Sequence, residues 1–238
     1  LALLKGGPGE RRAFLDDLLV DLDPRLHTTR INLERVLRQR NTLLRQAGGQ
    51  LTPGVGDSLD VWDSKLAETG EVLIAARQRL VDRLSPLVND HLRVLSGGVS
   101  NASLAYEESW SGPNLAAALS EARRDDLRRG TTTVGPHRDE VIITLDNLGA
   151  RHHSSQGEQR SLALAMRLAG HHLVAEDTGM RPVVLLDDVF SELDPDRSTA
   201  LLALLPKAQA VLTSAGNLPP GVVADHWYRI AAGRVEVQ

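Results

Sequence analysis

Apolar side chains recur every three or four residues through the first hundred positions, a spacing that predicts long amphipathic helices. They are expected over residues 10–22, over 28–46, and from a cap at Asp57–Ser58 to about residue 95, with a kink at Pro86. The last helix approaches a heptad seam, and two long helices joined by a short loop should pack antiparallel. We therefore expect residues 25–98 to form a helical arm, the alternative being two helices lying flat within an all-α body.

From residue 103 onward, short apolar runs alternate with helical segments. Strands are expected at 103–107, 141–145, 183–186 and 208–213, and helices at 113–129, 161–176 and 195–205. Two hairpins are expected, one pairing 141–145 with 150–153 around a turn at 146–149, the other pairing 226–230 with 234–237. The alternation predicts an α/β head made of residues 1–24 and 99–238, into which the arm is inserted.

Two acids, Asp187 and Asp188, directly follow the apolar run Val183–Leu186. This run predicts a strand buried on both faces of a parallel sheet, and ligands bind at the carboxyl ends of such strands. Nucleotide-hydrolysing folds hold a magnesium ion against a triphosphate with acids placed in this way. The plain alternative is a polar strand end, followed by a helix that Asp194–Pro195 caps.

A polar stretch with one glycine, residues 154–161, is expected to form a loop that opens into the helix at 161. Backbone N–H groups at a helix N-terminus attract anions, and Gly157 would permit close approach of a phosphate. The Ser155 hydroxyl could bond a phosphate oxygen. An ordinary capping loop is the alternative.

Composition narrows the classes of function. The chain has 238 residues, a net charge of −4 and no cysteine, which excludes disulfides, thiolate metal sites and cysteine nucleophiles. The charge argues against a uniformly basic nucleic-acid coat, and no apolar run is long enough to span a bilayer. Because the chain starts with Leu1 and its only methionines are Met166 and Met180, we expect a longer native protein.

Basic side chains suggest local contacts with a polyanion. In the helix at 28–46, four arginines lie on the arc opposite the apolar face: Arg30, Arg35, Arg38 and Arg45. They form either a phosphate-binding surface or a solvated face. In the turn Gly135–Asp139, Arg138 could couple nucleotide state to DNA or to a partner subunit, or could pair locally with Asp139. His137 and the pairs His152–His153 and His171–His172 are expected to be structural or exposed.

Four separated motifs carry a family resemblance. Ser155-Gln-Gly-Glu-Gln159, then a Leu/Ala helix, then Leu185-Leu-Asp-Asp-Val-Phe-Ser-Glu-Leu-Asp194 resembles the signature, Walker B and D-loop order of ABC-type ATPases. Together with Lys5–Asp16, Gln39–Leu44 and Thr132–Asp139, the sequence is similar to the RecF family of bacterial recombination-repair ATPases, whose head is similar to those of SMC-type proteins.

The resemblance implies an ABC-type, SMC-like ATPase head with an inserted helical arm. It also implies a cytoplasmic protein that uses ATP and Mg²⁺ and forms an ATP-dependent homodimer on DNA. With RecO and RecR it would load RecA at gaps and single-strand–double-strand junctions.

The same resemblance implies roles for individual residues. Asp187 would hold magnesium through water, and Asp188 would stand where most ABC ATPases keep a glutamate base. Because aspartate is one methylene shorter, we expect slow hydrolysis and a switch rather than a motor. The signature loop would reach ATP bound to the partner subunit through Ser155, Gln156, Gly157, Glu158 and Gln159. Ser191 and Asp194 belong to the D-loop, and Thr213 stands at the usual switch-histidine position.

The sequence contains no Gly-x-x-x-x-Gly-Lys-Ser/Thr phosphate loop. We therefore expect this chain alone to bind ATP weakly or not at all, with the loop supplied upstream in the intact protein. Two alternatives remain: a non-hydrolysing ABC-like scaffold that recruits proteins through the arm, and a transporter domain, which the long arm and Val189–Phe190 disfavour.

Overall fold

The computed structural model describes residues 2–216, 218–231 and 233–237, and the chain divides into two units, residues 1–180 and 181–238. The first unit holds ten elements: α1 (Ala2–Lys5), α2 (Pro8–Leu22), α3 (Arg25–Gln46), α4 (Pro53–Leu95), β1 (Ala102–Glu107), α5 (Leu115–Arg129), β2 (Glu140–Leu145), β3 (Leu148–Gly149), α6 (Ala150–His153) and α7 (Gln156–Thr178). The second unit holds β4 (Val184–Asp187), the 3₁₀ turn η1 (Val189–Glu192), α8 (Pro195–Leu204), β5 (Ala210–Thr213), β6 (Tyr228–Ala231) and β7 (Arg234–Val237).

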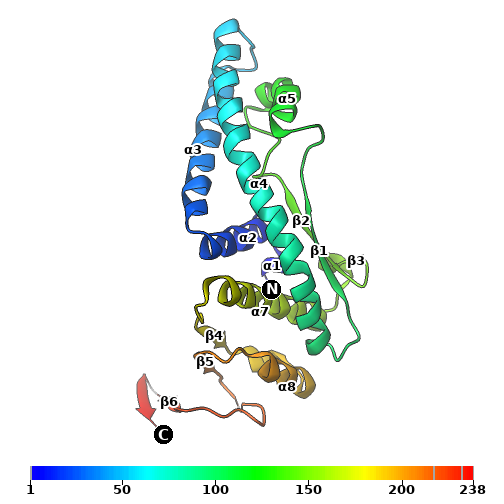
Figure 1. The fold of residues 1–238 in the computed structure, drawn as a ribbon, viewed down its shortest axis with the longest axis vertical. Coiled ribbons are helices and arrows are strands. Elements are labelled where there is room, and N and C mark those ends of the chain that lie inside the picture. The colour runs from blue at the N-terminus through cyan, green and yellow to red at the C-terminus, as the bar shows by residue number, and fades with distance from the viewer. Residues whose placement is uncertain (1, 217, 232, 238) are drawn as a thin grey trace. The chain divides into compact units, whose positions relative to one another are not determined.

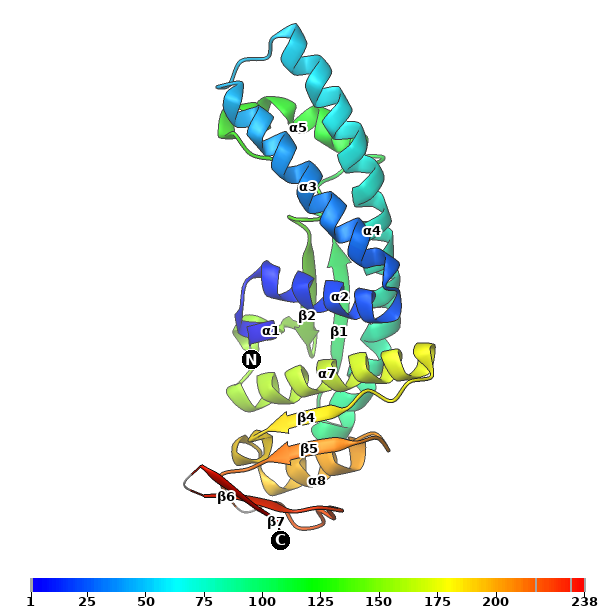
Figure 2. The same cartoon turned by 90° about the vertical axis from the view of Figure 1, so that its left-hand side faces the viewer.

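Helices α3 and α4 lie side by side and run in opposite directions, as the sequence predicted (Figures 1 and 2). Helix α5 packs against both helices near the end where they are joined. There Leu44, Leu59 and Leu127, one from each helix, form a buried apolar cluster. The long pair is therefore stabilised by a third helix that comes from beyond the predicted arm.

The second half of α4 is packed into the body of the first unit, against β1 and α7. Side chains of α4 also satisfy the outer edge of the antiparallel sheet β1–β2–β3. Ser85 Oγ accepts a hydrogen bond from Leu104 N (2.9 Å), and Asn89 Oδ1 accepts one from Ala102 N (3.0 Å). An edge strand covered in this way cannot pair with another chain. The helix continues through Pro86 without ending.

In the second unit, β4 and β5 form a parallel pair whose register sets Asp187 opposite Thr213. Strands β6 and β7 form an antiparallel hairpin. Among the described residues, no helix combines the length and the apolarity that a membrane span requires.

Four local expectations were wrong. Helix α4 begins at Pro53, capped by Thr52, so Asp57 and Ser58 lie inside it. Residues 150–153 form helix α6 instead of a strand, because their single apolar side chain, Ala150, gives no alternating face. Residues 156–160 belong to α7 and not to a loop. Strand β4 is buried on one face only, with Leu185 73% exposed, because its side chains alternate between a covered and an open face.

Candidate nucleotide site and arginine surface

The paired acids stand at the carboxyl end of β4, where the parallel strand β5 also ends. The Thr213 hydroxyl donates a hydrogen bond to Asp187 Oδ1. The backbone N–H of Asp188 donates to both Thr213 O and Thr213 Oγ1, each at 3.1 Å. One residue of β5 thus contacts both acids.

Asp188 has a left-handed backbone conformation (φ 48°), which is uncommon for a residue with a side chain. Both oxygens of its carboxylate lie within reach of a donor. Ala215 N donates to Oδ1 (3.3 Å), and the Ser191 hydroxyl lies 3.0 Å from Oδ2 and 2.8 Å from the Asp188 carbonyl, so that its one proton serves either acceptor. The geometry therefore fixes the direction of this carboxylate.

The remaining D-loop residue, Asp194, caps α8 by accepting a hydrogen bond from Arg197 N (2.8 Å). Its other oxygen lies 3.5 Å from Arg197 Nε. This cap fits the helix start that the sequence predicted from Asp194–Pro195.

The signature residues belong to the first unit and form the first turn of α7. Ser155 Oγ accepts a hydrogen bond from Glu158 N (3.3 Å), and Glu158 Oε2 accepts one from Ser155 N (2.7 Å), a capping box. These bonds use the polar groups of Ser155 and Glu158 within the helix. The N–H groups of Gln156 and Gly157, in the first turn, have no intrahelical acceptor and can bind an anion.

Gln159 is buried, with 5% of its surface exposed. Its amide Nε2 donates to the carbonyls of Ser154 (3.1 Å) and Arg151 (3.3 Å). The side chain therefore holds the turn that precedes α7, between α6 and the signature residues.

The donor set of the acid pair suits magnesium, which prefers oxygen ligands and keeps several of its waters. One or two carboxylates together with substrate phosphates complete such a site, so no larger protein cage is needed. Among the described residues, no group of three or more His, Cys, Asp or Glu side chains could hold a metal ion. Two adjacent carboxylates match the few protein ligands that a magnesium ion shared with a nucleotide would use. His152 and His153 are exposed in α6.

The four arm arginines differ in their surroundings. Arg30 is partly buried, and its Nη1 lies 3.2 Å from Asp17 Oδ1. Arg35, Arg38 and Arg45 are exposed on α3, and Arg45 donates to Thr42 Oγ1 (3.2 Å). The Arg45 side chain also packs against Gly130, at the end of α5.

Helix α5, which packs against α3, carries three further arginines that sequence reasoning missed: Arg124, Arg128 and Arg129. All three are exposed, and Arg128 pairs with Asp125 at 3.0 Å. The arginines before Gly130 are visible in the sequence. That they lie near α3 depends on tertiary packing, which the sequence pattern does not show.

Arg138 does not form the local ion pair with Asp139 that was the alternative to a coupling role. Arg138 donates from Nε and Nη2 to the carbonyl of Thr132 (3.3 and 3.2 Å). Asp139 is fully buried and instead accepts hydrogen bonds from Tyr106 Oη (2.6 Å) and from the Ser109 N–H and hydroxyl (2.8 and 2.9 Å). Tyr106 and Ser109 satisfy the buried Asp139 carboxylate, as a buried charged group requires, while the Arg138 side chain stays exposed.

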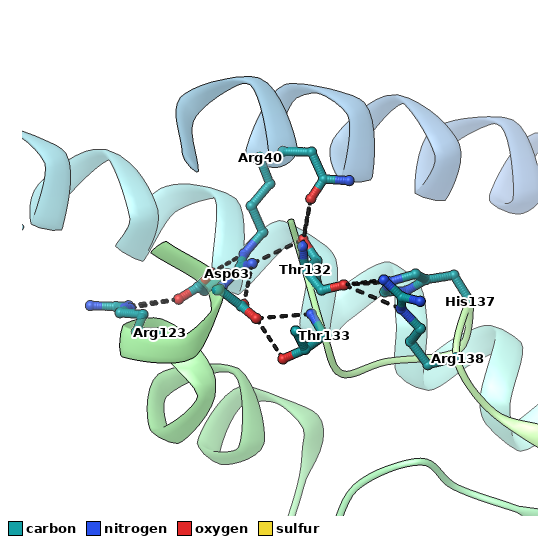
Figure 3. A network of polar contacts seen from close by, with 9 residues as sticks. Arg40, Asp63, Arg123, Thr132, Thr133, His137 and Arg138 are labelled. Atoms are coloured by element: carbon teal, nitrogen blue, oxygen red, sulfur yellow. Dashed lines mark hydrogen bonds and ion pairs between the residues drawn. The ribbon is translucent and has the colours of Figure 1, made fainter. Parts of the chain in front are cut away.

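His137 lies beside Arg138 and also contacts the Thr132 carbonyl, with Nε2 at 3.1 Å (Figure 3). Burial lowers the pKa of His137 to about 4, and the positive charges of Arg138 and Arg12 act in the same direction. The imidazole is therefore neutral at pH 7, and its Nε2 carries the proton because a carbonyl can only accept.

A fully buried arginine, Arg40, joins α3 to α4, to α5 and to the segment after α5 (Figure 3). It donates to Asp63 (2.6 Å), Asp126 (2.6 Å) and Thr132 Oγ1 (2.9 Å). Asp126 also accepts from the Thr133 N–H (2.8 Å) and hydroxyl (2.6 Å). We call Arg40, Asp63, Asp126 and Thr132 the Arg40 cluster. It was missed because the partners of Arg40 lie 23 to 92 residues away from it in sequence.

No protein-family model matches the chain. Curated relatives do: it is 42% identical over 251 residues to the DNA replication and repair protein RecF of Streptomyces avermitilis, and 41% identical over 255 residues to that of Frankia alni. Each alignment covers 99% of this chain and 67% of the relative. This chain belongs to the RecF family.

Solved structures agree with this assignment. The structure of RecF-ATP in the RecFOR pathway matches with a TM-score of 0.86 and 29% identity, over 99% of this chain and 64% of that one. The structure of RecF with ATPγS matches with a TM-score of 0.84 and 28% identity, over 99% and 65%. The predicted α/β class is confirmed, with the fold of RecF. The chain spans about two-thirds of the length of these RecF proteins.

Proposed function

We propose that this RecF-family chain is part of an ATP-dependent DNA-binding protein of recombinational repair. The protein dimerises on ATP in the cytoplasm and acts with RecO and RecR to load RecA at gaps and single-strand–double-strand junctions. Two findings support this: the relatives are DNA replication and repair proteins, and the similar solved structures are of RecF with ATP and ATPγS.

The observation that carries the nucleotide part of the proposal is the acid pair at the carboxyl end of β4. We assign magnesium binding, through water, to Asp187 and the general base to Asp188. The fixed, short side chain of Asp188 limits how closely it can approach an attacking water, which favours slow turnover. The protein is then a weak ATPase that acts as a switch.

We assign the signature residues to ATP held by the partner subunit in the dimer. Ser155, Gln156, Gly157 and Glu158 present the N-terminus of α7 to its γ-phosphate. Gln159 contributes by holding the turn before this helix. Ser191 and Asp194 form the D-loop. A phosphate loop with its lysine is required in addition, and the 238 residues do not contain its motif.

We assign DNA contacts to the exposed arginines of α3, Arg35, Arg38 and Arg45, and to Arg30 and Arg138. The neighbouring arginines of α5 enlarge the surface. Because phosphate contacts release counterions, this binding should weaken steeply with salt.

The nucleotide assignment is tested by Asp187→Asn in the full-length protein. Light scattering with and without ATP and Mg²⁺ should show a nucleotide-dependent dimer for the wild type and a weakened response for the variant. An unchanged response in the variant would contradict the magnesium role. A wild-type protein that stays monomeric with ATP would support a scaffold that recruits partners without responding to nucleotide.

A further inference from the structure

Thr213 contacts both acids through its own side chain. Any residue at the end of β5 could accept the Asp188 N–H with its backbone carbonyl, as Thr213 O does at 3.1 Å. The hydroxyl adds two further bonds: it donates to Asp187 Oδ1 and accepts from Asp188 N at 3.1 Å. These bonds connect residues 25 and 26 positions apart, so they are not a consequence of local turn geometry.

The direction of each bond follows from the groups involved. A backbone N–H can only donate, so the hydroxyl oxygen accepts from Asp188. Its single proton then points to the ionised Asp187 carboxylate, which can only accept. The hydroxyl engages one oxygen of Asp187, and because this residue is exposed, its other oxygen remains accessible to a water bound to a metal ion.

We propose that Thr213 is a positioning residue, whose hydroxyl orients the Asp187 carboxylate for magnesium. The inference rests on the proposed function, because it assumes that Asp187 faces the metal. Partners of a metal-facing carboxylate fix its rotamer, and their loss typically weakens metal affinity by about 10–100-fold.

The test measures the Mg²⁺ concentration needed for binding of a fluorescent, non-hydrolysable ATP analogue to the full-length protein. Thr213→Val keeps the shape and the β-branched side chain but removes the hydroxyl, so it should need about tenfold more Mg²⁺. Thr213→Ser keeps the hydroxyl and should titrate close to the wild type. Thr213→Ala, which also lacks the hydroxyl, should follow Thr213→Val and replaces it if the valine variant fails to fold.

Asp187→Asn separates this inference from the proposed function. If Asp187→Asn shifts the Mg²⁺ titration while Thr213→Val and Thr213→Ala titrate like the wild type, the positioning role is contradicted and the metal site stands. If none of the variants shifts it, the magnesium role of Asp187 itself is wrong. A shift for the valine and alanine variants but not for serine supports the inference.

Discussion

At the scale of single residues, Asp188 of the acid pair has a strained backbone conformation that its hydrogen-bond partners stabilise. A left-handed backbone costs a residue such as Asp188 roughly 1–3 kcal/mol. A hydrogen bond that its N–H donates to Thr213, and bonds that its carboxylate can accept from Ser191 and Ala215, hold it there. This accords with a carboxylate whose direction matters for the proposed chemistry.

His137 gives a prediction about pH. Its pKa is about 4 in the folded chain and near 6.5 when unfolded, so the unfolded state binds the proton first as the pH falls. Stability should therefore decrease from about pH 6.5 to about pH 4, with a contribution of about 3 kcal/mol from this residue. Urea unfolding at pH 7 and pH 4.5 would measure it.

His137→Gln is the control, since an amide cannot take up the proton. The variant should lose less stability than the wild type between these two pH values. An equal loss in both proteins would show that burial of His137 does not control its protonation.

Sequence reasoning placed residues well where a local rule sufficed. Asp187 and Thr213 were expected at strand ends, and Asp194 at a helix start, because apolar runs and Asp-Pro mark these positions. It could not show that Gln159 is buried or that Arg138 avoids Asp139, because both depend on competing partners elsewhere in the fold.

At the scale of elements, the Arg40 cluster holds three helices together by charge. Arg40→Met should lower the free energy of unfolding by about 3–5 kcal/mol, because it leaves Asp126 buried without its cation and Asp63 paired with Arg123 alone. Denaturant titration of the variant measures this loss.

Arg83→Met is the matched control. Arg83 pairs with Asp177 at 2.6 Å, but its side chain is 45% exposed, and such pairs contribute about 1 kcal/mol or less. Similar losses for both variants would mean that the Arg40 cluster contributes no more than a surface ion pair.

Element prediction succeeded for the long helices because their apolar period is sustained over many turns. It failed at residues 150–153 and at the start of α7, because four or five residues are too few to show a hydrophobic period. The capping box of Ser155 and Glu158 was visible in the sequence and would have placed the helix start correctly. The boundary of the arm stays a prediction, since α4 also packs against β1 and α7.

At the scale of the whole molecule, the arginines of α3 and α5 should govern DNA binding. In the full-length protein, Arg35→Gln with Arg38→Gln should reduce the slope of log affinity against log salt by about 2, since each lost phosphate contact removes about 0.9. Fluorescence anisotropy on gapped DNA at several salt concentrations measures the slope.

Arg83→Gln is the control for the Arg35 and Arg38 double variant, because Arg83 is already paired with Asp177. An unchanged slope for the double variant would show that these arginines form a solvated face and do not contact DNA phosphates. An equal decrease for Arg83→Gln would indicate a general effect of charge.

Asp188→Ala in the full-length protein tests whether the protein is an ATP-gated dimer that uses the acid pair for hydrolysis. Molar mass with ATP and Mg²⁺ and the rate of phosphate release are measured on the same sample. The variant should still dimerise with ATP while its turnover is lost. A variant that hydrolyses ATP at the wild-type rate, or a wild-type protein whose mass does not respond to ATP, would contradict this proposal.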